Sequence, residues 1–357
     1  MDKTEAKTLV ERCLPRFAAA GLPPLAADAV ASVMPKRIAS LWAGMGSVFQ
    51  LAITTTGGGT PPLTIVAKRV ELPRKCDSIG DQRKKDSYDV EAAFYSKGHA
   101  ERLIAAGAIV PFPLHVEHRP GEGVTICMTK VEGSSSHRGG SEAFVAWLAT
   151  LHATYWGSRA DEACGDGGLQ AQGCYWHLDT RPEEHARMGS SGFMGRLRLA
   201  ARAIDLRLKA DPLQSVCHGD AKGANILYAS GGAGGGAVAL VYDFQYCGKA
   251  CVAKDLAYFF NVEARASEEE PLLRAYHERL CALLAKQGDA PPSLEAVRTA
   301  HELALCDWRR FSEVGLGGWG DDGANRRVKA LLDRLDGGAA LPSEQAYIDA
   351  MQREFPV

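Results

Sequence analysis

The chain has 357 residues, of which 46% are hydrophobic and 24% charged, and its formal net charge is −2. This composition is ordinary for a globular protein and excludes a globally disordered chain, while the length fits one large domain or two lobes. The near balance of charge argues against nucleic acid as the main partner, because proteins that bind nucleic acids usually present a basic surface.

The first third of the chain predicts helices followed by an antiparallel sheet. Helical periodicity covers residues 4–34 in two pieces, which a Gly-Leu-Pro-Pro break at 21–24 separates, and Pro35 ends the second piece at 28–34. Residues 71–87 are polar and predict a loop, whereas residues 88–106 predict a strong helix. Strands are predicted at 38–41, 48–53, 63–70, 111–116 and 124–128.

Helices dominate after a Gly/Ser-rich break at 132–136, which we predict to separate two lobes. Further helices are predicted at 141–156, 195–209 and from 254 to the end, with an irregular stretch at 157–192 and a strand at 237–243. Strands first and helices later predict an α+β fold of two lobes. The smaller, β-rich lobe is residues 1–131, with N-terminal helices, and the larger, mostly helical lobe is residues 132–357.

The chain offers a candidate for each part that phosphoryl transfer requires: a cation on the phosphates, magnesium ligands, a base near the acceptor hydroxyl and a cover that excludes water. Lys68 is the candidate cation, because a lysine within the apolar strand at 63–70 is costly to bury without an anionic partner. Glu91, on the helix that follows, supplies that partner. Found in this order, the pair favours a phosphate-binding lysine over a lysine on an exposed face.

The candidate cover is the turn Gly44-Met45-Gly46-Ser47 between two predicted strands. Glycine lets backbone N–H groups approach phosphate oxygens closely, so Gly44, Gly46 and Ser47 are candidate nucleotide-binding residues. The third glycine of a Gly-x-Gly-x-x-Gly pattern is missing, with Phe49 in its place. Taken alone, the turn therefore favours a plain hairpin.

The candidate base lies in the segment Cys-His-Gly-Asp-Ala-Lys-Gly-Ala-Asn-Ile-Leu at 217–227. Asp220 would accept or orient the proton of the acceptor hydroxyl, and Lys222 would neutralise charge on the transferring phosphoryl group. Asn225 would give a neutral oxygen to magnesium, and we expect His218 to brace the loop through hydrogen bonds. The alternative interpretation is a turn between two strands that contains these residue types by chance.

A second candidate metal ligand is Asp243, which ends an apolar run at 239–242. A carboxylate at the end of a buried strand favours a ligand role, and magnesium prefers few carboxylates with phosphate and water oxygens completing its shell. The 23 residues from Asp220 to Asp243 suit a strand, a hairpin tip and a returning strand. This spacing predicts that both groups lie at one end of a sheet.

These motifs resemble those of the aminoglycoside phosphotransferase and choline kinase superfamily, which has a protein-kinase-like fold. The closest resemblance is to its ecdysteroid-kinase-like branch, also called CHK-kinase-like. The His-Gly-Asp-Ala-Lys-x-x-Asn segment at 218–225 resembles the catalytic loop of that branch, and Asp-Phe-Gln at 243–245 resembles its counterpart of the Asp-Phe-Gly motif in protein kinases. Two further segments, at 148–153 and 254–259, resemble the family's helices before and after these motifs.

The resemblance implies an enzyme that uses ATP and Mg²⁺ to phosphorylate a hydroxyl group of a small molecule. It also implies that the adenine ring lies along the segment from Thr129 to Val131. Choline is not supported as the acceptor, because choline kinases usually carry a different residue at the position of Gly219. The residues to which it assigns roles are the base Asp220, the magnesium ligands Asn225 and Asp243, and the ATP-gripping pair Lys68 and Glu91.

Three other classes of protein are less well supported. A protein kinase would carry an arginine between His218 and Asp220, and no Ala-Pro-Glu segment follows Asp243. A kinase-like scaffold would have lost the candidate lysine, base or metal ligands, all of which are present. A metal-dependent hydrolase is suggested only by His115-x-x-His118, which has no nearby glutamate or third ligand.

The acceptor pocket is the least defined part of the predicted site. Asp307 and Trp308 would suit a cationic group, but the spacing of Trp308 and Phe311 favours ordinary helix core. The candidates on the second lobe's helices are Tyr276, His301, Asp307, Trp308, Phe311 and Trp319.

The cysteines and the N-terminus bear on the compartment. Ten scattered cysteines without a Cys-x-x-Cys pair predict reduced, buried thiols rather than a zinc site. The N-terminus lacks the apolar region of a secretory signal, and no stretch reaches the roughly 18 apolar residues that span a bilayer. We therefore expect a cytoplasmic protein whose partner is a hydroxylated small molecule, without nucleic acid, membrane or an obligate protein partner.

Overall fold

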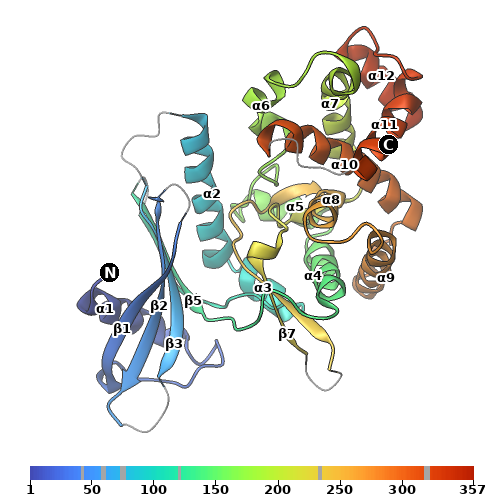
Figure 1. The fold of residues 1–357 in the computed structure, drawn as a ribbon. Helices are drawn as coiled ribbons and strands as arrows, with labels where there is room; N and C mark the ends of the chain where they lie inside the picture. Colours follow the sequence, from blue (N-terminus) through green and yellow to red (C-terminus); the bar gives the residue numbers. More distant parts are fainter. Residues whose placement is uncertain (42–43, 58–61, 73–77, 120–121, 232–234, 317–321) are drawn as a thin grey trace. The chain divides into compact units, whose positions relative to one another are not determined.

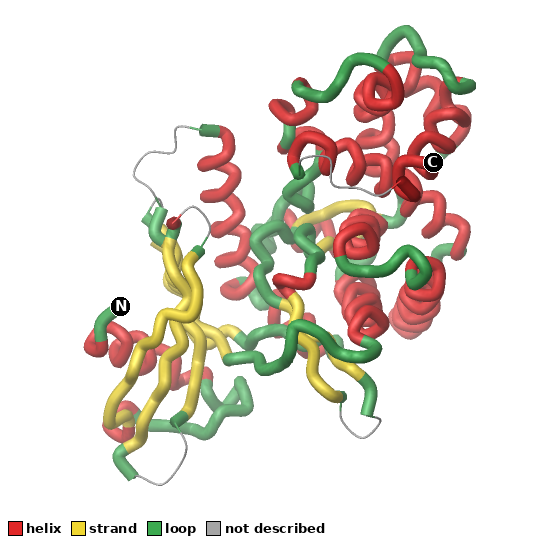
Figure 2. Tube along the Cα trace, in the orientation of Figure 1, coloured by secondary structure: helices red, strands yellow, loops and turns green. Residues whose placement is uncertain are grey.

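The computed structural model describes residues 1–41, 44–57, 62–72, 78–119, 122–231, 235–316 and 322–357 (Figure 1). The chain forms two compact units, Met1–Ser134 with Leu240–Gln245, and Ser135–Ala239 with Tyr246–Val357. The longest strands belong to the first unit, and most helices belong to the second (Figure 2). The predicted α+β class, with a strand-rich N-terminal part and a mostly helical C-terminal part, is confirmed.

A five-stranded antiparallel sheet forms the centre of the first unit, in the order β1-β2-β3-β5-β4. Its strands are β1 (Val30–Ser40), β2 (Gly46–Thr55), β3 (Leu63–Val70), β4 (Pro113–Arg119) and β5 (Gly123–Thr129). The predicted hairpin and the strands after it are confirmed, and β3 has the predicted bounds. Val and Ile fill much of β3, as expected for a strand packed in a sheet.

The predicted second helix at 28–34 is wrong, because these residues enter η2 (Ala27–Ala29) and the first half of β1. Val30 and Val33 are both buried, and their spacing suggested one face of a helix. In a regular strand two residues three apart point to opposite faces, but the register shifts between Val30 and Ser32 and brings both to the core side. Pro35 fits within β1 because this strand lies at the sheet edge.

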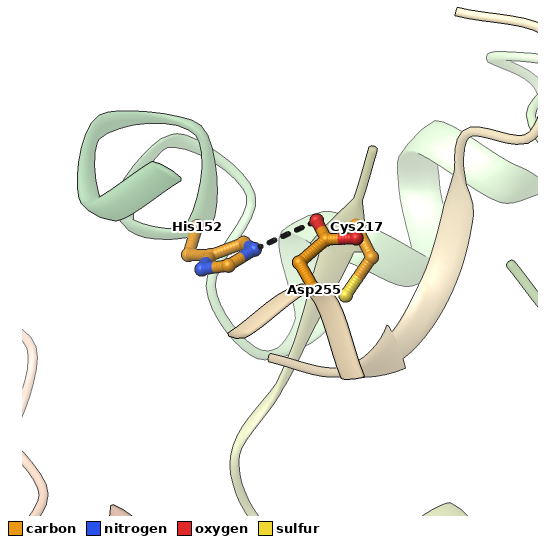
Figure 3. Close-up of side chains that lie close together, drawn as sticks. All are labelled: His152, Cys217 and Asp255. Carbon is orange, nitrogen blue, oxygen red and sulfur yellow. Dashed lines mark hydrogen bonds and ion pairs between the residues drawn. The ribbon is translucent and has the colours of Figure 1, made fainter. Parts of the chain in front are cut away.

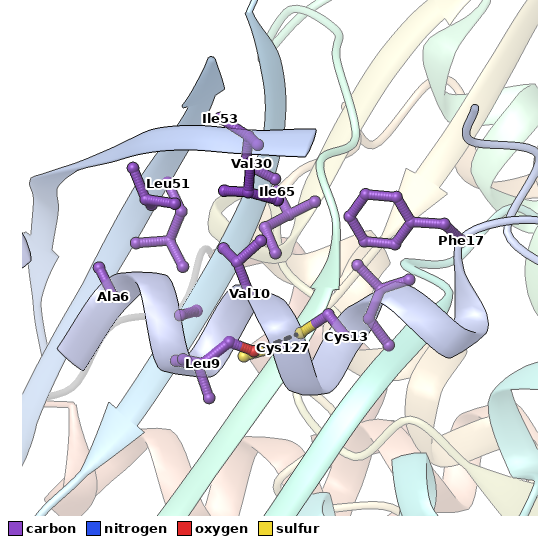
Figure 4. Close-up of a cluster of buried hydrophobic side chains, with 13 residues drawn as sticks. Ala6, Leu9, Val10, Cys13, Phe17, Val30, Leu51, Ile53, Ile65 and Cys127 are labelled. Atoms are coloured by element: carbon purple, nitrogen blue, oxygen red, sulfur yellow. Dashed lines mark hydrogen bonds between the residues drawn. The ribbon is translucent and has the colours of Figure 1, made fainter. Parts of the chain in front are cut away.

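Helix α1 (Lys3–Cys13), followed by η1 (Leu14–Arg16), covers one face of the sheet. The helix begins where the side chain of Asp2 accepts a hydrogen bond from the backbone N–H of Glu5, at 2.9 Å. Figure 4 shows Val10 and Cys13 of α1 packed toward the strands. Burial of each leucine-sized side chain in such a cluster contributes about 1.5–3 kcal/mol.

Two helices follow β3 in the first unit, α2 (Ile79–Ser96) and α3 (His99–Ala105). The predicted loop at 71–87 is therefore wrong over 79–87, and residues 73–77 lie outside the described part of the chain. Helix α2 starts early because the Ser78 hydroxyl accepts a hydrogen bond from the backbone N–H of Asp81, at 3.0 Å. Gly98, with φ of 83°, separates the two helices within the predicted span 88–106.

Helices make up most of the second unit, together with one short antiparallel ribbon and most of a second two-stranded ribbon. The stretch at 157–192, predicted to be irregular, contains two short α-helices and the 3-10 helix η4 (Leu178–Thr180). The helices are α4 (Gly140–Thr154), α5 (Ser158–Cys164), α6 (Pro182–Ala186), α7 (Gly192–Ala210), α8 (Ala253–Val262), α9 (Glu269–Gln287), α10 (Leu294–Gly315), α11 (Asp322–Asp336) and α12 (Glu344–Glu354). The ribbons pair β6 (Gln214–Cys217) with β9 (Gly248–Cys251), and β7 (Ile226–Ser230) with β8 (Ala237–Val241).

Two further observations concern the chain as a whole. Within the described ranges, no helix has both the length and the apolar character needed to cross a membrane. The nine cysteines of the described part are all free thiols, and seven of them are buried.

Candidate active site

Lys68 lies in a buried ion pair within the first unit. Its Nζ is 2.6 Å from Oε2 of Glu91 on α2 and 3.1 Å from Oδ1 of Asp243. Burial lowers the pKa of Lys68, but the charges of Asp243 and Glu91 outweigh burial, so the net direction is upward. Burial also raises the pKa of Glu91, against the opposing effect of Lys68. The structure thus brings the two predicted partners together and adds Asp243 to them.

The Asp-Phe-Gln segment at 243–245 is fixed to helix α2 through Phe244 and Gln245. Gln245 donates from Nε2 to Oδ1 of Asp243 at 2.5 Å, while its Oε1 accepts from Nζ of Lys84 at 2.9 Å. The ring of Phe244 stacks on Phe94 with centroids 3.8 Å apart. Asp243 itself has a φ of 68°, which is uncommon for a residue other than glycine. Gln245 thus holds the carboxylate of Asp243 in place, a role that the motif alone did not predict.

The glycine turn joins β1 to β2. Gly44 has φ of 71° and Gly46 has φ of 129°, and a Cβ at Gly46 would collide with the backbone oxygen of Arg69. Glycine is therefore required at position 46 by packing within the sheet. Ser47 pairs with Ser40 and Arg69 in the sheet register. Residues 42 and 43 lie outside the described part of the chain.

The segment predicted to hold adenine follows β5. Thr129 ends that strand, where its backbone N–H donates to the oxygen of Phe112 and its hydroxyl accepts from the N–H of Phe112, both at 2.9 Å. The Thr129 side chain is thus engaged with the neighbouring segment. Val131 is half-buried.

Asp220 lies in the loop after β6, within the second unit, and is only 4% exposed. Its Oδ2 accepts from Nδ2 of Asn225 at 3.0 Å and lies 2.9 Å from Nζ of Lys222. Its Oδ1 accepts from the hydroxyl of Tyr258, on α8, at 3.0 Å. The structure therefore brings Asp220, Lys222 and Asn225 together and adds a tyrosine that the sequence did not indicate.

Asn225 and Asp243 each offer an oxygen of the kind that magnesium prefers. The amide nitrogen of Asn225 donates to the backbone oxygen of Asp220 at 2.9 Å as well as to its Oδ2. This orientation leaves the amide oxygen of Asn225 available for a cation, among the contacts of the described residues. The side chain of Asp243 is 31% exposed, so its carboxylate is accessible from solvent.

Asp255, in the first turn of α8, braces the loop that carries Asp220. It accepts hydrogen bonds from the backbone N–H groups of His218 at 2.6 Å and Gly219 at 2.9 Å. Figure 3 shows Nε2 of His152 directed at the same carboxylate, at 3.4 Å. Burial raises the pKa of Asp255, but the hydrogen bond from His152 and the other donors outweigh it and hold the pKa below its usual value.

His152, Cys217 and Asp255 lie close enough together to suggest a metal site (Figure 3). Two observations favour the role of a brace instead. Both oxygens of Asp255 already accept backbone N–H groups. The thiol of Cys217 is also directed at the backbone oxygens of Ala250 and Cys251, which lie 3.8 and 3.5 Å from its Sγ.

The two residues before the candidate base are constrained by their surroundings. His218 is fully buried, and its Nδ1 accepts the backbone N–H of Asp220 at 3.3 Å. Gly219 has φ of 81°, and a Cβ there would collide with the backbone oxygen of Tyr246. Backbone conformation and crowding therefore both require glycine between the histidine and the aspartate.

The acceptor candidates on α10 belong to the core of the second unit. Trp308 and Phe311 are almost fully buried, as the helical spacing favoured. Nζ of Lys254 lies 2.9 Å from Asp307, and Nη2 of Arg310 lies 2.7 Å from it. Burial raises the pKa of Asp307, but these two cations outweigh it and lower the pKa to about 2. The charge of Asp307 is thus already paired within the protein.

The remaining candidates are dispersed. The hydroxyl of Tyr276 lies 2.8 Å from Nδ1 of His152, and Nε2 of His301 lies 3.0 Å from Glu269. Trp319 lies outside the described residues. His115 is half-buried on β4, and His118 bonds to Asp89 at 2.8 Å.

Comparison with known proteins supports the resemblance predicted from the motifs. Residues 183–288, under a third of the chain, match the family model of the ecdysteroid kinase-like family. The matched span contains Asp220, Asn225 and Asp243. The predicted resemblance is thus confirmed over these residues. A search of curated protein sequences returned no match.

Several solved structures are similar to this chain at low sequence identity, and the three named here belong to small-molecule kinases. One is a choline/ethanolamine kinase family protein from Mesorhizobium loti, at 17% identity and a TM-score of 0.45, covering 97% of this chain and 99% of that one. Another is a choline kinase from Streptococcus pneumoniae, at 14% identity and a TM-score of 0.45, covering 90% and 94%. A spectinomycin phosphotransferase in complex with ADP and spectinomycin has 9% identity and a TM-score of 0.48, covering 100% and 99%.

Proposed function

We propose that this protein is an ATP-dependent kinase that phosphorylates a hydroxyl group of a small molecule, with Asp220 as the base. The observation that supports this most is the buried carboxylate of Asp220, which Asn225 and Lys222 contact within the segment that matches the ecdysteroid kinase-like family. A carboxylate held in this way has a defined orientation, which a general base requires.

The proposed reaction is an in-line displacement on the γ-phosphorus of ATP. The acceptor oxygen forms a bond to phosphorus, and the bond from phosphorus to the bridging oxygen of ADP breaks. The proton of the acceptor hydroxyl passes to Asp220 and then to solvent. Lys222, whose side chain is 36% exposed, would neutralise charge on the phosphoryl group in transfer.

Except for Asn225, the residues proposed to bind the nucleotide and its metal belong to the first unit. Lys68, held by Glu91, would contact the α- and β-phosphates, and its raised pKa keeps it charged for that task. Asn225 and Asp243 would hold Mg²⁺, which neutralises phosphate charge when bound. The residues proposed to cover the phosphates are Gly44, Gly46 and Ser47, and those proposed to face adenine are Thr129 and Val131.

A screen followed by one substitution tests the proposal. Wild-type protein is incubated with ATP, Mg²⁺ and a library of hydroxylated small molecules, and phosphorylated products are detected by mass spectrometry. Asp220→Asn is then expected to lower the rate with the acceptor found by at least about a hundredfold, because a positioned base contributes 10²–10⁴-fold. Binding of ATP and the melting temperature are expected to stay close to wild type.

Asp349→Asn is the matched control, since Asp349 is an exposed carboxylate on α12. This variant is expected to retain the wild-type rate. Near-normal phosphorylation by Asp220→Asn would contradict the proposed mechanism.

A further inference from the structure

We infer that Tyr258 is a positioning residue for Asp220, and that its hydroxyl determines which carboxylate oxygen takes the proton of the acceptor. This inference rests on the proposed function, in which Asp220 is the base. It assigns a role in the reaction to a residue of the segment 254–259 for which the sequence predicted none.

The contacts of Asp220 divide unequally between its two oxygens. Oδ2 has two partners, Asn225 and Lys222, whereas Oδ1 has one, the hydroxyl of Tyr258. A carboxylate oxygen accepts about two hydrogen bonds. Among the described residues, the remaining acceptor position is therefore on Oδ1, next to the Tyr258 hydroxyl. An acceptor hydroxyl that bonds there would lie beside the phenol oxygen.

The ring of Tyr258 is held firmly. It is 3% exposed and stacks on Trp308, with centroids 4.4 Å apart and planes at 27°. The edge of Trp176 packs against it at 6.5 Å. Burial and the adjacent charge of Asp220 raise the pKa of Tyr258, so the phenol remains a hydrogen-bond donor across the working pH range.

One turn of helix α8 holds the catalytic loop at two points. Asp255 and Tyr258 are three residues apart and therefore lie on the same face of the helix. Asp255 binds the backbone of the loop at His218 and Gly219, and Tyr258 binds the side chain of Asp220. The backbone and the carboxylate are thus fixed by a single rigid element, which is what precise orientation of a base requires.

A second tyrosine extends the contact. The hydroxyls of Tyr175 and Tyr258 lie 3.0 Å apart, and because Tyr258 donates its proton to Asp220, Tyr175 is the donor in this pair. The hydrogen bonds then run in one direction, from Tyr175 through Tyr258 to Oδ1. Tyr175 is half-buried, so it is more exposed to solvent than Tyr258. Loss of its hydroxyl should weaken the orientation of Tyr258 but not abolish it.

The test uses the full-length protein with Mg²⁺-ATP as the probe and water as the acceptor, read as ADP formation. Tyr258→Phe is expected to lower kcat about tenfold and Tyr175→Phe about threefold, with the KM for ATP within twofold of wild type. The tenfold value corresponds to loss of one hydrogen bond to a charged group. Tyr347→Phe is the matched control, because this buried tyrosine donates to Asp336 at 2.6 Å on α11. Its kcat is expected to stay within twofold of wild type.

The outcomes separate this inference from the proposed function. Equal rates of ADP formation by wild type and Asp220→Asn would refute the base itself. A Tyr258→Phe protein with kcat within twofold of wild type, beside an inactive Asp220→Asn, would overturn the role of Tyr258 alone. A loss of kcat matched by a larger drop in melting temperature than in Tyr347→Phe would show a merely structural role. If Tyr258→Phe fails to fold, Tyr175→Phe serves as the test, because Tyr175 is only half-buried. An unchanged kcat in that variant would overturn the proposed chain of hydrogen bonds.

Discussion

Replacing Asp255 with asparagine would keep the size of the side chain and remove the charge that holds the loop before Asp220. Asparagine has one acceptor oxygen, so only one of the backbone N–H groups of His218 and Gly219 would keep its partner. The other N–H would face an amide nitrogen in a site where Asp255 is 1% exposed. A lost hydrogen bond to a charged group costs about 1.5–3 kcal/mol, and an unsatisfied buried donor about 1–3 kcal/mol.

Together these terms predict a loss of about 3 kcal/mol or more in the free energy of unfolding of the second unit. For a unit of this size the melting temperature should fall by about 6–12 °C. Differential scanning calorimetry of the full chain measures the change, with the exposed Asp349→Asn as the control. A melting temperature within 2 °C of wild type would refute the conclusion that Asp255 braces the loop. Phosphoryl transfer by the folded variant should also be slower, because the loop is less ordered.

Two further predictions concern other buried ionisable groups. Glu91→Gln leaves Lys68 buried with half of its countercharge. The variant should lose about 3 kcal/mol of unfolding free energy in urea and show a KM for ATP at least about fivefold higher. An unchanged unfolding free energy together with an unchanged KM would contradict the pairing. Burial lowers the pKa of His177 to about 3, so the unfolded chain binds a proton below about pH 6.5 that the folded chain does not, and stability falls as the pH drops. His177 should lower the free energy of unfolding by about 2 kcal/mol at pH 5 relative to pH 7.5. His177→Gln should remove this contribution to the pH dependence of stability, whereas replacement of the exposed His118 by glutamine should leave it in place. Identical slopes for wild type and His177→Gln would refute this assignment.

The fold was most predictable where one physical signal dominated. The strand at 63–70 has an apolar run with clear bounds, and its predicted and observed limits agree. The prediction at 28–34 was wrong because a bulge within β1 imitates helical spacing, and bulges leave little trace in composition. The early start of α2 was missed because the capping residue Ser78 precedes a polar first turn, which has the composition of a loop.

Some residues of the candidate site were likewise predictable from the sequence, and others were not. Lys68 and Glu91 were predicted as partners because a buried charge in a strand requires an opposite charge, whereas the second partner, Asp243, was not predicted. Tyr258 was not predicted, since a tyrosine in an apolar helix has the pattern of core, and only its position shows the hydroxyl directed at Asp220. Asp255 carried a usable signal. A carboxylate within the apolar helix Ala253–Val262 requires strong donors, and the sequence did not show where they would come from.

The left-handed backbone at Gly219 also limits how this chain can change. The backbone oxygen of Tyr246 occupies the position that a Cβ at residue 219 would take, and the backbone of Cys174 lies next to it. An arginine at this position, as protein kinases carry between their histidine and aspartate, would have to displace two separate chain segments at once. Control of this loop through a phosphate-binding arginine at position 219 would therefore require rearrangement of the two segments that carry Tyr246 and Cys174.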